Sequence, residues 1–144
     1  MRVKNSLSND KTVQLWKQFM PRGNEIEQKI GTKCYSIQSF PDDLTKVGFS
    51  PDMIFDKWAA FQVLDFKNIP DGMEAFTISK GKYAVFLHKG PASTFFKTIQ
   101  YIFGEWLPFS EYSLDSRAHF EVLDSDNYNP NDPDAEEEVW IPIK

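Results

Sequence analysis

The sequence of 144 residues has little of what most catalytic and metal sites need. It contains one cysteine, Cys34, and two histidines, His88 and His119, which lie far apart in the chain. One cysteine forms no internal disulfide, and two distant histidines make no helical pair of metal ligands. Glycine-rich nucleotide motifs and the Gly-x-Ser-x-Gly nucleophile motif are also missing. We therefore expect neither a bound metal nor another cofactor.

Long hydrophobic runs and a signal peptide are absent as well. No apolar stretch approaches the roughly 20 residues that a membrane span requires, and no basic segment leads into an apolar one after Met1. We expect a cytoplasmic protein with no membrane partner.

Basic charge is scarce, and the C-terminal part has least of it. The net charge is −5 and the isoelectric point is about 5.0. Residues 1–34 carry 7 basic and 3 acidic groups, whereas residues 105–144 carry 2 basic and 11 acidic groups. Nucleic-acid affinity comes largely from neutralised phosphates, so we expect no direct nucleic-acid binding. A cationic ligand would be favoured, although surface acidity more often serves solubility.

Aromatic residues, by contrast, are abundant. The chain has 13 Phe, 5 Tyr and 4 Trp, and hydrophobic residues make up 41% of it. That content and length predict a single domain, residues 1–144, with one sizeable core.

Two helices and several strands follow from the hydrophobic spacing. A short amphipathic helix is predicted over Lys11–Met20, where Pro21 stops it, and a longer one from Ser93 to Leu107. Alternation and turn residues predict a hairpin of Ala75–Ser79 with Tyr83–Leu87. The other predicted strands are Tyr35–Phe40, Trp58–Phe66, His119–Leu123 and Glu138–Ile143.

The two halves repeat one order of elements. The first module covers about residues 1–66 and the second about 75–144, each with a helix and then two strands. Only the second has a visible leading strand, because aligning Pro21 with Pro108 puts the first one before Met1. We expect Met1–Leu7 to be a remnant at most, which leaves a sheet edge open to homodimer formation.

The predicted class is α+β. Duplicated strand-helix-strand-strand modules would build a mainly antiparallel sheet, with both helices on one face and a ligand groove between them.

Glu121 is the main candidate for chemistry. Its neighbours Phe120 and Val122 point to one face of their strand and Glu121 to the other. A solvent-facing side chain is the commoner meaning of this pattern. If that face lines the groove, a desolvated carboxylate among rings could bind a ligand cation. The further candidate ligand-binding residues are Trp58, Tyr101, Trp106, Glu138 and Trp140.

The order and spacing of several segments resemble one known family. These segments are Gly81–Gly90, Tyr101–Pro108, the pair Phe120–Glu121 and the ending Glu137–Lys144, with Leu15–Trp16 and Lys57–Ala59 in the first half. Together they are similar to the GyrI-like small-molecule-binding family, the effector-binding domain also attached to AraC-type and MerR-type bacterial transcription regulators.

The resemblance implies paired modules and an aromatic cleft with a central glutamate for lipophilic, often cationic compounds. The glutamate position matches Glu121, and the family's ending matches Glu138 and Trp140.

The sequence leaves three functions open. The leading one is a stand-alone protein that senses or sequesters a lipophilic or cationic aromatic compound, without its own DNA-binding domain. The alternative is a hydrolase of reactive electrophiles, with Glu121 as general base and Tyr83 or Tyr101 as proton donor. The third is a protein-interaction module similar to a gyrase inhibitor, in which the acidic C-terminal part mimics a polyanion.

Overall fold

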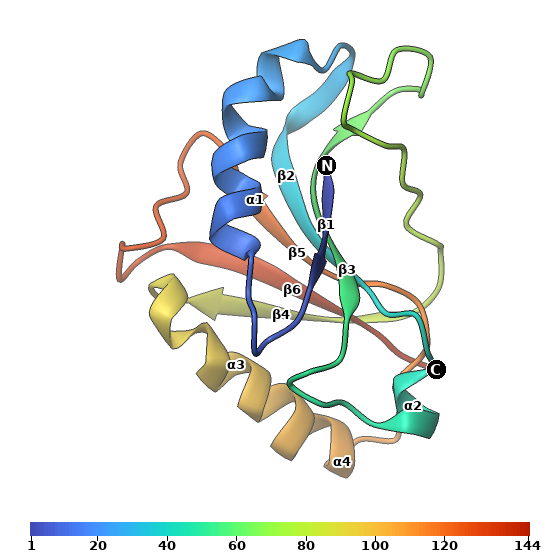
Figure 1. The fold of residues 1–144 in the computed structure, drawn as a ribbon. Coiled ribbons are helices and arrows are strands. Elements are labelled where there is room, and N and C mark those ends of the chain that lie inside the picture. The colour runs from blue at the N-terminus through green and yellow to red at the C-terminus, as the bar shows by residue number, and fades with distance from the viewer.

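A six-stranded antiparallel sheet with helices on one face forms the body of the molecule (Figure 1). The computed structural model describes all residues, 1–144. The strands are β1 (Arg2–Asn5), β2 (Lys29–Ser39), β3 (Phe55–Val63), β4 (Tyr83–Lys89), β5 (His119–Asp124) and β6 (Glu136–Pro142). The longer helices are α1 (Thr12–Phe19) and α3 (Phe95–Tyr101). The shorter ones are η1 (Met20–Glu25), α2 (Leu44–Val47), η2 (Ala92–Thr94), η3 (Ile102–Trp106) and α4 (Leu107–Phe109). The α+β prediction is therefore confirmed.

The strand order, β1-β3-β2-β5-β6-β4, has the same pattern in both halves of the chain. In each half the first strand pairs with the third, β1 with β3 and β4 with β6. The expectation that the first half lacks its leading strand is wrong, because Arg2–Asn5 forms it within the segment Met1–Leu7. Four residues are too few to show a reliable alternation, which is why the sequence did not reveal the strand.

The predicted hairpin before β4 is also wrong. Residues 75–79 form no strand, and the free edge of β4 has no partner. The apolar alternation there has another cause. Phe76 and Ile78 pack against the core cluster that contains Trp58, on the face of the sheet opposite the helices.

The second helix runs without a break from Ala92 to Phe109, as the hydrophobic stripe predicts. Its Ile102–Trp106 turn is a π-helix, in which the Leu107 amide donates to the Ile102 carbonyl. Ile102 is completely buried and packs on Val139 and Ile141 of β6. That contact fixes the helix over the β6 side of the sheet.

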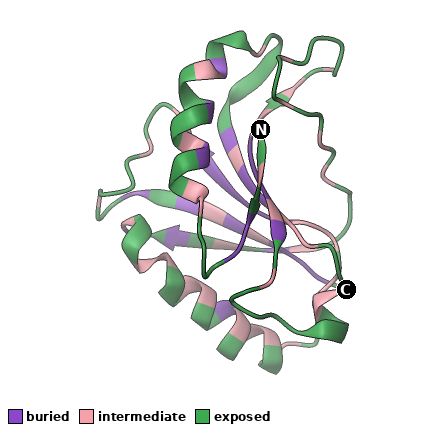
Figure 2. Ribbon diagram, viewed as in Figure 1, coloured by how far each residue is buried: buried purple, intermediate pink, exposed green.

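The pairing register sorts the side chains of the sheet into two faces. Phe120 pairs with Ile37 and Trp140, and these residues belong to the face away from the helices. Glu121 pairs with Ser36 and Val139, on the helix-facing side. The middle strands β2 and β5 lie between those that α1 and α3 cover. β5 is buried along most of its length, whereas the first half of β2 is exposed (Figure 2).

Candidate functional site

Glu121 lies in the middle of the sheet, on the face that carries the helices. Its residue is only 9% exposed, so the solvent-facing alternative does not hold. The side-chain amide of Gln38 donates to Oε2 of Glu121 at 2.9 Å. The ammonium of Lys57, itself buried, lies 3.9 Å from the same oxygen. Glu121 is thus a carboxylate with two partners, Gln38 from the neighbouring strand β2 and Lys57 from β3, the strand beyond it.

A second carboxylate, Glu137, shares this face. It is 8% exposed, and its side chain forms none of the ion pairs or hydrogen bonds of the molecule. Because Glu121 pairs with Val139, Glu137 is its diagonal neighbour, typically about 7–8 Å away across two strands. Burial, and then the charge of Glu121, raise the pKa of Glu137 to about 7. Near neutral pH this carboxyl group is therefore poised between its two charge states.

Other groups near the two carboxylates are held neutral. Burial and then the charge of Glu137 raise the pKa of Tyr128 to about 12, and burial raises the pKa of Cys34 to about 11. Burial lowers the pKa of His119 to about 4. The Cys34 thiol is thus neither a ready nucleophile nor a ready metal ligand, which leaves the carboxylates and Lys57 as the charged groups.

Rings from two sides cover His119. Phe103 of the second helix stacks on it with centroids 6.2 Å apart, and Phe40 meets it edge-on at 5.2 Å. The helix-facing side of β5 thus carries the uncharged His119 ring, packed between Phe40 and Phe103, and the Glu121 carboxylate two residues further along the strand.

Three of the predicted site residues do not lie with Glu121. Trp58, Glu138 and Trp140 are on the opposite face of the sheet. There the Trp140 indole donates to Glu138 at 2.9 Å and its ring stacks on Phe120 at 5.2 Å. The expectation that they surround one groove with Glu121 is wrong, because adjacent residues of a strand point to opposite faces and the sheet separates them.

Tyr101 and Trp106 are on the helix-facing side, but above the outer strand β4. Both rings meet Phe86 of β4 edge-on, at 6.4 Å and 5.0 Å. Phe103 occupies the other flank of the helix and reaches β5. The prediction chose the wrong flank, because the helical stripe shows which residues are buried but not which flank faces the middle of the sheet.

The tyrosines considered for a hydrolase also lie away from Glu121. Tyr83 is on the opposite face, where its hydroxyl donates to the Ser79 carbonyl and Arg117 lies over its ring at 4.4 Å. Tyr128, by contrast, is close enough to Glu121 for the charge of that carboxylate to contribute to its raised pKa.

Sequence reasoning missed Glu137, Lys57 and Gln38. A signal for Glu137 was present, because it alternates with Val139 and Ile141, the apolar residues of the last strand. It was therefore Glu137, and not Glu138, that shared their buried side. For Lys57 and Gln38 no local pattern distinguishes a buried polar residue from an exposed one.

Comparison with known protein families matches residues 1–144 to the GyrI-like small molecule binding domain. The chain belongs to the GyrI-like family. Transcriptional regulator BrlR from Pseudomonas aeruginosa (strain PAO1) is 33% identical over 141 residues, which are 96% of this chain and 48% of that protein. The GyrI-like chain thus spans about half the length of this relative.

Membership of the GyrI-like family assigns small-molecule binding to the chain. The α+β architecture, with helices on one face of an antiparallel sheet, agrees with that assignment. None of the helices is long and apolar enough to span a membrane.

Proposed function

We propose that this GyrI-like domain binds a lipophilic, cationic aromatic compound on the helix-facing side of β2, β5 and β6, and that it senses or sequesters that compound. The observation that carries the proposal is the imbalance of buried charge there. Two carboxylates, Glu121 and Glu137, share the face with one ammonium, Lys57. A bound cation would supply the missing positive charge.

The unpaired Glu137 is the more important of the two acids. Glu121 already has Lys57 and Gln38, whereas Glu137 has neither an ion pair nor a side-chain hydrogen bond. A buried carboxylate without a partner is costly, and it responds by taking up a proton. A ligand cation beside it would replace that proton and lower its pKa. Ligand affinity should therefore depend on the charge of the ligand and on pH.

The rings near this face favour the same ligand class. Phe40, Phe103 and His119 form a row along one side of Glu121. Aromatic faces attract cations and stack on flat ligands. The similarity to a protein named a transcriptional regulator supports a sensing role, which we propose for this chain as well.

Two ligands of the same shape and different charge test the proposal. Phenyltrimethylammonium carries one positive charge, and tert-butylbenzene is its uncharged isostere. We expect the ammonium compound to raise the unfolding temperature of the wild-type protein at pH 8 in a way that depends on the Glu137 carboxylate. Any rise with tert-butylbenzene should not depend on that carboxylate and should be equal in the wild type and in Glu137→Gln. The midpoint is measured by thermal unfolding, with each variant compared with its own ligand-free sample.

Glu137→Gln is the decisive variant and Glu136→Gln its matched control, because residue 136 is the exposed neighbour on the same strand. The ammonium-induced rise should disappear in Glu137→Gln and persist in Glu136→Gln. An equal rise in both variants would show that the cation binds elsewhere and would overturn the proposal.

A further inference from the structure

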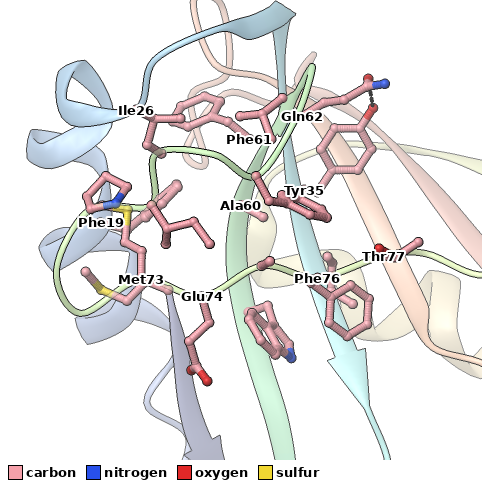
Figure 3. A pocket seen from close by; sticks show the side chains of 18 of the residues that line it. Phe19, Ile26, Tyr35, Ala60, Phe61, Gln62, Met73, Glu74, Phe76 and Thr77 are labelled. Carbon is pink, nitrogen blue, oxygen red and sulfur yellow. Dashed lines mark hydrogen bonds between the residues drawn. The ribbon is translucent and has the colours of Figure 1, made fainter.

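The C-terminal part of β3 has a free edge. β1 pairs with residues 55–58, and Met1 exchanges two backbone hydrogen bonds of 2.9 Å with Ala59. Beyond Ala59 no strand pairs with β3 on the edge that β1 occupies. The other edge of β3 pairs with β2. The chain that follows β3 runs past this free edge, and a cavity of about 370 Å³ lies between the two (Figure 3).

The walls of the cavity are apolar and rich in rings. Hydrophobic residues account for 15 of the 21 that line it. Trp58 is 7% exposed, and its ring lies 4.9 Å from that of Phe76. The aromatic lining residues are Phe19, Tyr35, Trp58, Phe61, Phe66 and Phe76, and Figure 3 shows several of them converging from both sides of the strand. The volume and the lining are typical of pockets that enclose small organic ligands.

At neutral pH the lining offers no buried charge to a ligand, because burial lowers the pKa of the Met1 amine to about 6 and that amine donates to the Ala59 carbonyl. The two acidic side chains of the lining are Asp65, which is partly exposed, and Glu74, which is half exposed. Glu74 already forms an ion pair with Arg2 at 2.7 Å. An ionic ligand would lose its hydration here without gaining a partner, so the chemistry of the walls selects an uncharged molecule.

The segment that closes the cavity is loosely attached. Residues 74–78 make no backbone-to-backbone hydrogen bond. The side chains of Phe76 and Ile78 and the Glu74–Arg2 pair hold the segment in place. Local openings cost little where backbone hydrogen bonds and buried contacts are few. Displacing residues 74–78 would therefore break no backbone hydrogen bond of the sheet.

We propose that this cavity is a second small-molecule site, which takes one uncharged, ring-containing apolar molecule. Its floor, including Tyr35, Ile37 and Trp58, belongs to the face of the sheet opposite Glu121. The site is therefore separate from the one proposed for cations. An apolar ligand would remove the exposed ring surfaces of the lining from water and gain dispersion contacts with them.

Fluorescence titration with N-phenyl-1-naphthylamine, an uncharged apolar dye, tests this site. We expect saturable binding of one dye molecule per chain. Ala60→Phe places a ring among the lining side chains and should weaken binding by at least about tenfold, or 1.4 kcal/mol. Val85→Phe, an enlargement at a half-exposed position of β4 on the same face, should leave it unchanged.

Two further variants keep the test decisive. Thr77 is an exposed lining residue, so Thr77→Trp obstructs the cavity without touching the core if Ala60→Phe fails to fold. Glu137→Gln should bind the dye as the wild type does. Dye binding that does not saturate, that survives both obstructing variants, or that is lost in Glu137→Gln would overturn the second site.

Discussion

Replacing Glu137 by glutamine should make the protein more stable at alkaline pH. In the folded protein, burial and the charge of Glu121 raise the pKa of Glu137 from its ordinary value of 4.5 to about 7. Between pH 4.5 and about pH 7, Glu137 therefore keeps its proton in the folded state, whereas the unfolded state has already released it. The contribution of Glu137 to the free energy of unfolding is therefore greatest below pH 4.5 and decreases as pH rises towards 7.

The magnitude follows from the two pKa values. The difference corresponds to roughly 3 kcal/mol at about 1.4 kcal/mol per pKa unit. Near pH 4.5, Glu137→Gln and the wild type should have similar free energies of unfolding. At pH 8.5 the variant should be more stable by up to about 3 kcal/mol, because it has no charge to bury.

Urea unfolding followed by tryptophan fluorescence, at pH values from 4.5 to 8.5, provides the assay. The difference between variant and wild type must be used, because other groups titrate in the same range with the opposite sign. Burial lowers the pKa of His119 to about 4 and that of the Met1 amine to about 6, so both favour folding as pH rises.

Glu136→Gln serves again as the control and should show no pH-dependent difference. If Glu137→Gln differed from the wild type by the same amount at pH 4.5 and pH 8.5, Glu137 would not be a proton-binding group of the folded state. The argument for an uncompensated buried carboxylate would then fail.

Two further outcomes follow from burial. Ile102→Ala should lower the free energy of unfolding by about 2–5 kcal/mol, because Ile102 is completely buried under the helix, whereas Phe109→Ala, at a residue 88% exposed, should change it by less than about 0.5 kcal/mol. Urea unfolding at pH 7 separates the two, and similar losses would contradict the core assignment. His119 should lower the stability of the wild type between pH 6.5 and pH 4, because the unfolded state protonates this residue and the folded state does not. In His119→Leu the decrease over this range should be smaller by up to about 3 kcal/mol. An equal pH dependence in the variant and the wild type would contradict burial of His119 as the cause.

The elements were largely predictable because each had a local signal. The stripe from Phe95 to Trp106 predicted the second helix, and alternation around Phe120 predicted the strand that carries Glu121. β1 was not predicted, because a strand of only four residues shows no reliable alternation. Residues 75–79 were misread because alternating apolar residues pack equally well from an unpaired extended segment, as Phe76 and Ile78 do.

The candidate site was less predictable. Glu121 could be singled out as a carboxylate on an apolar strand, and its resemblance to a family position reinforced that choice. Its partners Lys57 and Gln38 come from strands distant in sequence, and only the pairing register brings them to the same carboxylate.

The sequence by itself determined which residues share a face of each element, because periods of 2 and 3.6 residues are properties of the local backbone. It thus grouped Glu137 with Val139, and it placed Tyr101 and Phe103 on opposite flanks of Ile102. Only the tertiary structure decided which face the helices cover and which flank meets the middle of the sheet. Those choices depend on strand order and on the direction in which a helix crosses the sheet, and both arise from contacts between segments far apart in the chain.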